Sequence, residues 1–419
     1  MLKSEFKECI SKIVSRQTII YTSLSLMASA CNFFSAIMLG RSFGVSDYGV
    51  IVTLIALNTN LRVFMGPVST LIIRYAAMED EEGRKGLSDA GVLAIIINLT
   101  TIVLMLIGIN PLMKYASISS WFEYLFFIVS ILLSSIGCIG HDLVQARQNL
   151  ILLGICDVML IVVRTVIAIG CGMIGKGPIS IIYGIALGYV SVLVLAYKYI
   201  KQKLCEMSGA WIFKVHRESI EYYIWALLLS LISTAYLNGG DILLGKIYSE
   251  NESIGYYSVA SNISRIAMYL IVTPLGTILF TKLVSKQNKE DNQKKLLLTA
   301  EFVSVCGIIV YGGVTLLASN IIISVLYGSA FLDAKKYLLT NLIMVMGVGI
   351  YYLCLQYILA IGKIKDFTII CAFWALVAFL YIMFSRCKLN SIPIVFFIAI
   401  IMSIICLLLR ESRARRSEK

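Results

Sequence analysis

The sequence predicts an all-α polytopic membrane protein: about 12 transmembrane helices in two parallel six-helix halves around a central cavity. The first reason is composition, because 59% of the 419 residues are hydrophobic and only 14% are charged, against roughly 25% charged in soluble domains. The second is that apolar stretches of about 20 residues, enough to cross about 30 Å of hydrocarbon as a helix, recur along the chain. The third is an internal repeat. Because the stretches are continuously apolar rather than alternating, a transmembrane β-barrel is excluded.

The apolar stretches divide the chain into spans joined by short loops. Residues 1–17 precede the first span as a charged amphipathic segment, either a helix on the membrane surface or a packed cytoplasmic arm. Residues 412–419 follow the last span as a basic tail. The spans are expected near residues 18–39, 49–73, 90–109, 121–144, 150–172, 178–198, 220–240, 254–281, 296–318, 336–359, 366–384 and 392–410.

Basic residues are unequally distributed between the loops. When both termini and alternate loops are counted as one side, that side holds 25 of the 36 Lys and Arg residues and the other side holds 8. Cytoplasmic loops carry such an excess, so both termini are expected in the cytoplasm. The net charge of +12 reflects this bias and an attraction to anionic lipid head groups, so no nucleic acid partner is expected.

Cysteine and histidine give no sign of a metal or redox site. Most of the 11 cysteines lie inside apolar runs, and the chain has no C-x-x-C motif. His141 and His216 each stand alone in the sequence. We therefore interpret cysteine here as a small apolar side chain and expect no metal and no cofactor.

Two stretches about half the chain apart read almost alike. Residues 37–50 are IMLGRSFGVSDYGV and residues 242–257 are ILLGKIYSENESIGYY. An even number of predicted spans separates them, so both copies would point the same way across the membrane. The repeat predicts two halves, residues 18–205 and 206–411, related by an axis along the membrane normal.

Each copy of the repeat leads into a proline. Pro67 opens PVSTLIIRY after the first copy, and Pro274 opens PLGTILFTK after the second. Proline removes a backbone hydrogen bond and kinks a helix, so matching bends would let one half rock against the other. We interpret the two prolines as helix kinks that serve gating; the alternative is that each merely fills a packing niche.

Arginines inside the spans are the candidate substrate-binding groups. A guanidinium at the membrane centre costs about 2.5–3.5 kcal/mol on the translocon scale, so it tends to face a partner or a wet cavity. Arg62 and Arg265 each precede one of the two prolines, on similar faces of matching helices. They are expected to converge on a cavity from opposite walls, with snorkelling or ion pairing as the alternative.

Three further cations and one acid complete the candidate set. Arg164 is either a cavity cation or half of a structural ion pair with Asp157, seven residues earlier. Asp157 is also the candidate for ion coupling. Arg41 and Lys246, the cations of the repeated phrase, would lie at the outer rim and assist release of an anion, or are simply loop cations. Arginine binds phosphate through a planar fork, so a lipid-linked phosphate is the expected ligand.

Three segments carry a resemblance to a known family: LGRSFGVSDYG at 39–49, LLGKIYSENESIGYYSVASNISR at 243–265 and LYGSAFLDAKKYL at 326–338. The chain resembles the polysaccharide (O-antigen or capsule repeat-unit) flippases of the multidrug/oligosaccharidyl-lipid/polysaccharide exporter superfamily. The resemblance implies a bacterial inner-membrane protein that moves an undecaprenyl-diphosphate-linked oligosaccharide to the outer leaflet by alternating access. It also implies that cavity cations grip the diphosphate. The two extra spans of the peptidoglycan-precursor branch are absent, which puts a lipid-tail groove of that kind in doubt.

Two other functions compete with this interpretation. A drug or cation antiporter of the same superfamily would need an acid at the heart of its cavity, and Asp157 is the candidate. A membrane glycosyltransferase or polymerase would need catalytic residues on a sizeable outer loop, and the loops here are short. We therefore expect a transporter rather than an enzyme. Its expected partners are the lipid-linked oligosaccharide and the bilayer, with a polysaccharide polymerase and a chain-length regulator as further candidates.

Overall fold

The computed structural model describes residues 16–78, 80–207, 216–237, 239–284, 290–361 and 364–417. Throughout these ranges the regular structure is helical, and no strand occurs in them. Nine of the described stretches are long and apolar enough to cross a membrane. The predicted class, an all-α polytopic membrane protein, is therefore confirmed. The predicted segment at residues 1–17 and tail at residues 412–419 fall wholly or partly outside the described residues.

The chain divides into two compact units that do not follow the sequence order. The first contains residues up to 43 together with residues 61–227. The second contains residues 44–60 together with residues 228–419. Residues 44–60 belong to the predicted first half, 18–205, but they pack with the second unit. The predicted halves, 18–205 and 206–411, stay a prediction.

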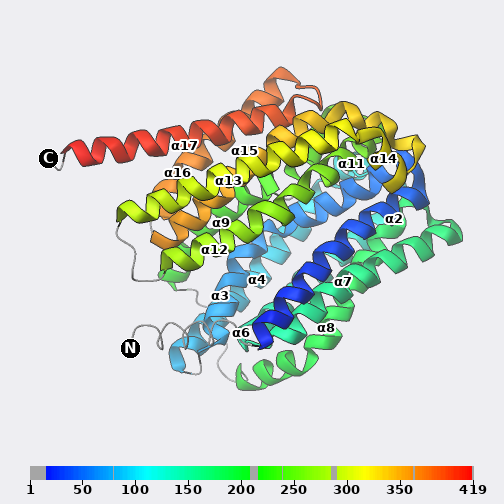
Figure 1. Cartoon of the computed structure of the whole chain (residues 1–419). Coiled ribbons are helices and arrows are strands. Elements are labelled where there is room, and N and C mark those ends of the chain that lie inside the picture. The colour runs from blue at the N-terminus through cyan, green and yellow to red at the C-terminus, as the bar shows by residue number, and fades with distance from the viewer. Residues whose placement is uncertain are drawn as a thin grey trace. The chain divides into compact units, whose positions relative to one another are not determined.

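The first unit is built around three long helices that follow one another in sequence: α6 (Trp121–Ala146), α7 (Leu150–Cys171) and α8 (Ser180–Met207). Close approach of α6 to α8 requires glycine at 137, since a Cβ there would lie 2.6 Å from Cδ1 of Tyr189. A Cβ at Gly184 of α8 would likewise lie 2.3 Å from the carbonyl oxygen of Arg164 in α7. The first part of α2 runs beside α7 (Figure 1), where the hydroxyls of Ser35 and Thr165 are 2.5 Å apart. The helices that contribute to this unit are α2 (Arg16–Leu61), α3 (Gly66–Ala76), α4 (Glu81–Ile107), α5 (Ile109–Tyr115), α6 (Trp121–Ala146), α7 (Leu150–Cys171), α8 (Ser180–Met207) and the start of α9 (Arg217–Leu237).

The second unit packs around one long helix, α15 (Lys335–Ile361). This helix contacts α11, α12, α13 and α17 (Figure 1). Aromatic side chains fill its core: the rings of Tyr236 and Tyr351 are 5.5 Å apart, and those of Tyr236 and Phe396 are 5.4 Å apart. Its helices, after the end of α9, are α10 (Gly240–Tyr248), α11 (Asn251–Ala267), α12 (Thr273–Val284), α13 (Glu290–Leu317), α14 (Ser319–Leu326), α15 (Lys335–Ile361), α16 (Ile364–Ser385) and α17 (Ile392–Ser417).

The two copies of the repeated phrase each contain one break in an otherwise helical path. In the first copy, α2 is interrupted at Gly44, whose φ of 75° and ψ of 178° are accessible to glycine and strained for other residues. In the second copy, α10 ends at Tyr248, Ser249 after it is extended, and α11 begins at Asn251. The loop expected between residues 39 and 49 is therefore helical except at this glycine.

Candidate functional site

Arg62 lies in a 3₁₀ turn, Arg62–Met65, that joins α2 to α3. Its guanidinium donates hydrogen bonds to the Tyr189 hydroxyl and to the Cys138 sulfur, the latter at 2.9 Å. Both acceptors are side chains that are neutral in their ordinary state at neutral pH. The Nε of Arg62 is buried and has no hydrogen-bond partner among the described residues. Among the described residues, Arg62 therefore has no carboxylate as a hydrogen-bond partner, and one of its donors is unused.

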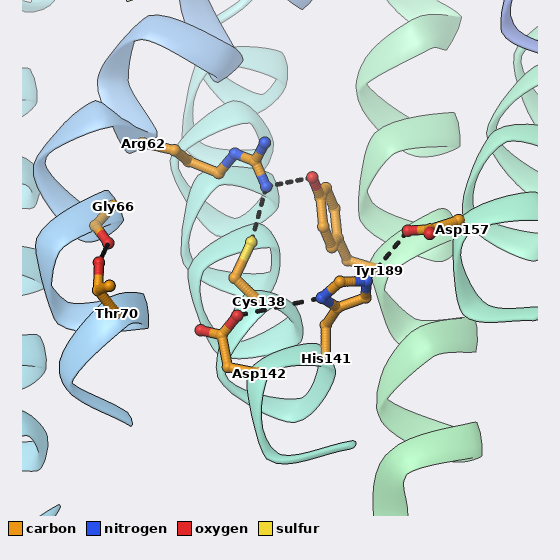
Figure 2. A network of polar contacts seen from close by, with 8 residues as sticks. All are labelled: Arg62, Gly66, Thr70, Cys138, His141, Asp142, Asp157 and Tyr189. Carbon is orange, nitrogen blue, oxygen red and sulfur yellow. Dashed lines mark hydrogen bonds and ion pairs between the residues drawn. The ribbon is translucent and has the colours of Figure 1, made fainter. Parts of the chain in front are cut away.

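Three titratable side chains lie around Cys138 and Tyr189, the two groups that accept hydrogen bonds from this arginine (Figure 2). His141 Nε2 is 3.0 Å from Asp157 Oδ1, and its Nδ1 is 4.0 Å from Asp142 Oδ1. Asp142 is only 6% exposed, and its Oδ2 has no hydrogen-bond partner in the described part of the chain. Cys138, His141 and Asp142 fall at i, i+3 and i+4 on α6, which places them on one side of that helix.

Both histidines, which stand alone in the sequence, contact carboxylates in the structure. His141 contacts a carboxylate from α7 as well as one from its own helix. His216 contacts Asp89 of α4 at 2.9 Å through Nδ1, and Ser219 donates to the same carboxylate at 2.9 Å. Sequence spacing shows only the neighbour Asp142, because Asp157 and Asp89 come from other helices. The described residues still contain no group of three His, Cys, Asp or Glu that could hold a metal ion.

Arg164 of α7 points to a different partner from the one considered in the sequence. Its guanidinium donates to Asn32 Oδ1 of α2 at 2.9 Å. Asp157, the alternative ion-pair partner, instead contacts His141. Arg164 thus ties α7 to the first part of α2, next to the hydrogen bond between Ser35 and Thr165.

Arg265, near the end of α11, is held by a carboxylate. It donates to Asp241 Oδ1 at 3.2 Å and to the Leu237 carbonyl at 2.8 Å. Asp241 is fully buried, and the Tyr257 hydroxyl donates to its second oxygen at 2.6 Å. Arg265 also lines a cavity of about 260 Å³ in the second unit. Further residues from α9, α12, α15 and the turn Met268–Val272 line the same cavity: Tyr236, Leu237, Met268, Tyr269, Thr273, Asn341, Met344, Val345, Val348 and Tyr352.

The structure therefore gives Arg62 and Arg265 separate local environments. Arg62 belongs to the first unit and Arg265 to the second. Their convergence on one cavity stays a prediction.

A family model described as "Polysaccharide biosynthesis protein" matches residues 38–336, more than two thirds of the chain. The chain belongs to this family. The match includes both copies of the repeated phrase and the candidate arginines, and it confirms the predicted resemblance to the polysaccharide exporters. No curated protein matches the sequence.

Solved structures show the fold of this polysaccharide biosynthesis protein. One similar structure is the lipid II flippase MurJ in an inward closed conformation, with a TM-score of 0.76, 15% identity, and coverage of 94% of this chain and 87% of that one. Another is the Vibrio cholerae MATE transporter VcmN in the bent form, with a TM-score of 0.54, 13% identity, and coverage of 96% and 98%. A third is an inward-facing multidrug resistance MATE family transporter of the MOP superfamily, with a TM-score of 0.54, 14% identity, and coverage of 94% and 97%.

The two prolines of this family member occupy equivalent places. Pro67 is the second residue of α3, and α3 directly follows the 3₁₀ turn that contains Arg62. Pro274 is the second residue of α12, and α12 directly follows a π-helical turn, Met268–Val272. In both copies the α-helical hydrogen-bond pattern is interrupted just before the proline. Their role in gating stays a prediction.

The rim cations lie at corresponding places in the repeated phrase. Arg41 is an exposed residue of α2, three residues before the break at Gly44. Lys246 lies in the last turn of α10 and donates to the Asn251 side chain at the start of α11. Partial burial lowers the pKa of Lys246 from its usual value.

Sequence reasoning missed Tyr189, Cys138, His141 and Asp142 as members of the site. They lie on α6 and α8, far in sequence from Arg62, and carry no motif of their own. The one usable signal was Asp142 near the end of a span, one residue after His141. An acid beside a histidine within an apolar segment is rare enough to indicate a polar network.

Proposed function

We propose that this polysaccharide biosynthesis protein is a flippase. It moves a polyprenyl-diphosphate-linked oligosaccharide repeat unit from the inner to the outer leaflet by alternating access, for surface polysaccharide assembly. The family, the shared fold with a lipid II flippase, and the cations inside the helices support this function. Transport rather than catalysis is in keeping with those relatives.

The observation that carries the proposal is the state of Arg62. Its hydrogen-bonded partners are a tyrosine hydroxyl and a cysteine sulfur, and its Nε is unused. A diphosphate oxygen is a stronger acceptor than either neutral group, because hydrogen bonds between charged partners are roughly twice as strong as neutral ones. A guanidinium in this setting therefore has both the charge and a spare donor for the phosphate of a lipid-linked cargo. Arg265, Arg164, Arg41 and Lys246 are proposed as further contacts along the path.

A twelve-span layout is part of the same proposal. Two of the nine apolar stretches are 51 and 54 residues long, more than twice the length that one crossing needs. Gly44 divides the first, and the positive φ angles of Gly175 and Gly177 divide the second. The helices α11 and α12, with the turn between them, supply a further crossing. Six crossings in each half place both termini on the basic, cytoplasmic side of a bacterial inner membrane.

The test is transport of a fluorescent polyprenyl-diphosphate oligosaccharide in proteoliposomes. Arg62→Gln is expected to lower the initial rate at least tenfold, and Arg62→Lys to retain part of it because lysine keeps the charge but loses the planar fork. Arg74→Gln is the matched control, because Arg74 also lies beside a tyrosine ring, that of Tyr75 on α3, but is exposed. Equal rates for Arg62→Gln and Arg74→Gln would reject the proposal.

A drug or cation antiporter is the second candidate. The observation that favours it is the pair of carboxylates, Asp142 and Asp157, on either side of His141 within the helices of the first unit. If this function is correct, Asp157→Asn will abolish cation-driven transport of an organic cation, whereas Arg62→Gln will leave it within twofold of wild type.

A further inference from the structure

An open groove lies in the first unit beside α3, which contacts both α4 and α6. Its volume is about 390 Å³. The residues that line it come from four helices: Ile72 of α3; Leu87, Gly91, Ala94, Ile95, Asn98, Leu99 and Ile102 of α4; Leu132, Ile136, Ile139 and Leu143 of α6; Ile200 and Lys203 of α8.

The residues that line the groove extend along α4 and α6. Its lining on α4 runs from Leu87 to Ile102, which is about 22 Å at 1.5 Å per residue. Its lining on α6 runs from Leu132 to Leu143, about 16 Å on the same basis. One leaflet contributes only about 15 Å of the hydrocarbon core. With its head-group region one leaflet is about 20–22 Å deep, so the groove is about as long as one leaflet is deep.

The wall of the groove is suited to hydrocarbon. Apart from Lys203, its one polar side chain is Asn98, whose amide already donates to the Ala94 carbonyl at 2.8 Å. On the open side, Ile95 is 46% exposed and Ile136 is 46% exposed. A ligand lying here would meet apolar side chains along nearly its whole length.

One end of the groove carries a positive charge. Lys203 is only 8% exposed and lies within the last turns of α8. Leu87, near the start of α4, and Leu143, near the end of α6, line the same end. A cation at the end of an apolar groove matches an amphiphile with an anionic head and an apolar tail.

We infer that this groove holds the polyprenyl tail of the cargo while the diphosphate head lies at the Lys203 end, before the head passes to Arg62. The assignment rests on the proposed flippase function. Charge favours a polyprenyl diphosphate over a phospholipid, because the diphosphate brings two negative charges to the Lys203 end whereas a phospholipid phosphodiester brings one. The route from groove to arginine is short: Ile139 lines the groove, and its neighbour Cys138 accepts the hydrogen bond from Arg62 on the next face of α6.

The tail gains little free energy by entering the groove. The tail moves from the lipid hydrocarbon to apolar side chains, so the hydrophobic effect does not favour binding. Only closer packing of the tail, and the attraction of the head group to Lys203, favour the bound state. Changes that fill the groove are therefore expected to weaken binding several-fold rather than by orders of magnitude.

The experiment measures binding of undecaprenyl diphosphate and of inorganic diphosphate to the full-length protein in phosphatidylglycerol nanodiscs. Ile95→Trp fills the groove. Ile96→Trp is its matched control, because Ile96 is 50% exposed on the same helix but does not line the groove. We expect Ile95→Trp and Lys203→Gln each to weaken undecaprenyl diphosphate binding about fivefold. Ile96→Trp should leave it unchanged, and inorganic diphosphate, which reports on Arg62, should bind Ile95→Trp and wild type alike.

Two results would overturn the inference. One is equal weakening by Ile95→Trp and Ile96→Trp. The other is labelling of the groove by photoreactive phosphatidylglycerol that undecaprenyl diphosphate does not displace, which would assign the groove to bulk lipid. Failure of the proposed function is recognisable separately, since inorganic diphosphate would then bind Arg62→Gln and wild type equally well.

Discussion

The two copies of the repeated phrase, with the helices that follow them, share one backbone architecture. They differ in the charge of the side chains that contact their arginines. Each copy passes through a helix, a break, a second helix, an interior arginine, a turn that is not α-helical, and a helix with proline at its second position. The break is a left-handed glycine in the first copy and an extended serine in the second. The backbone plan is therefore shared even where its local chemistry differs.

The arginines are where the copies diverge. Arg62 donates to a hydroxyl and a sulfur, whereas Arg265 donates to a buried carboxylate and a carbonyl. An anion that reaches Arg62 displaces neutral acceptors. An anion that reaches Arg265 competes with Asp241, which would be left as a buried charge. Equivalent positions in a repeat thus need not have equivalent roles, and we assign the stronger anion-binding role to Arg62.

The largest effect is expected from removing the negative partner in the second copy. Asp241→Asn leaves the Arg265 guanidinium without its counter-charge in a buried setting, which costs about 3–5 kcal/mol when one member of a buried pair is removed. Thermal unfolding in detergent measures the loss. The double variant Asp241→Asn/Arg265→Gln should recover most of it. A wild-type melting temperature for Asp241→Asn alone would show that the two arginines differ less than their contacts indicate.

The glycines of the repeated phrase provide the next test. A Cβ at Gly49 would lie 1.9 Å from the Asn251 carbonyl oxygen, and one at Gly255 would lie 2.2 Å from the Val45 carbonyl oxygen. Each alanine variant should therefore force the two segments apart and cost about 1–3 kcal/mol, although alanine is the better helix former.

Two other helical glycines are matched controls for this effect. Gly170 and Gly313 have no atom within 4 Å of a built Cβ. Their alanine variants are expected to unfold at or slightly above the wild-type temperature. If Gly49→Ala and Gly255→Ala behave like these controls, the crossing of the two copies does not contribute to stability.

Much of this architecture could be predicted because it depends on local sequence. Apolar runs of membrane length predict helices, and the repeat predicts corresponding breaks and prolines. Residues 44–60 show the limit: residues 49–60 are helical as expected, but the packing of this segment with the second unit depends on contacts such as Asn262 to the Tyr48 hydroxyl. Such contacts leave no periodic pattern in the sequence.

The candidate site was only partly predictable for the same reason. Arg62 and Arg265 stand out because charges inside apolar runs are costly. Their partners do not stand out: Tyr189 and Cys138 are ordinary residues of apolar helices, and Asp241 lies at a helix start. The difference between a neutral and a charged partner therefore required the structure.

A smaller effect is expected from changing Tyr189, the neutral partner of Arg62. Tyr189→Phe removes one acceptor from Arg62, and a hydrogen bond to a charged group contributes about 1.5–3 kcal/mol at most. Because the tyrosine competes with an incoming anion, we expect lower thermal stability together with several-fold tighter binding of inorganic diphosphate. Tyr199→Phe is the control, since Tyr199 is on the same helix and accepts from Asn149 instead. Weaker diphosphate binding by Tyr189→Phe would mean that the hydroxyl positions Arg62 rather than competing for it.

The smallest effect separates the rim cations, Arg41 in the first copy and Lys246 in the second. Partial burial lowers the pKa of Lys246, so the folded protein releases this proton before the unfolded chain does. The unfolded state then binds more protons just below the usual lysine pKa of about 10.4, and stability rises with pH in that window. Solvent screening of this half-buried group keeps the change below about 1 kcal/mol. Arginine stays charged through this range, so Arg41 in the first copy causes no corresponding pH dependence of stability. Thermal unfolding between pH 8 and 10 should show a rise that Lys246→Gln lacks, and the same pH dependence in that variant would assign the rise to other groups.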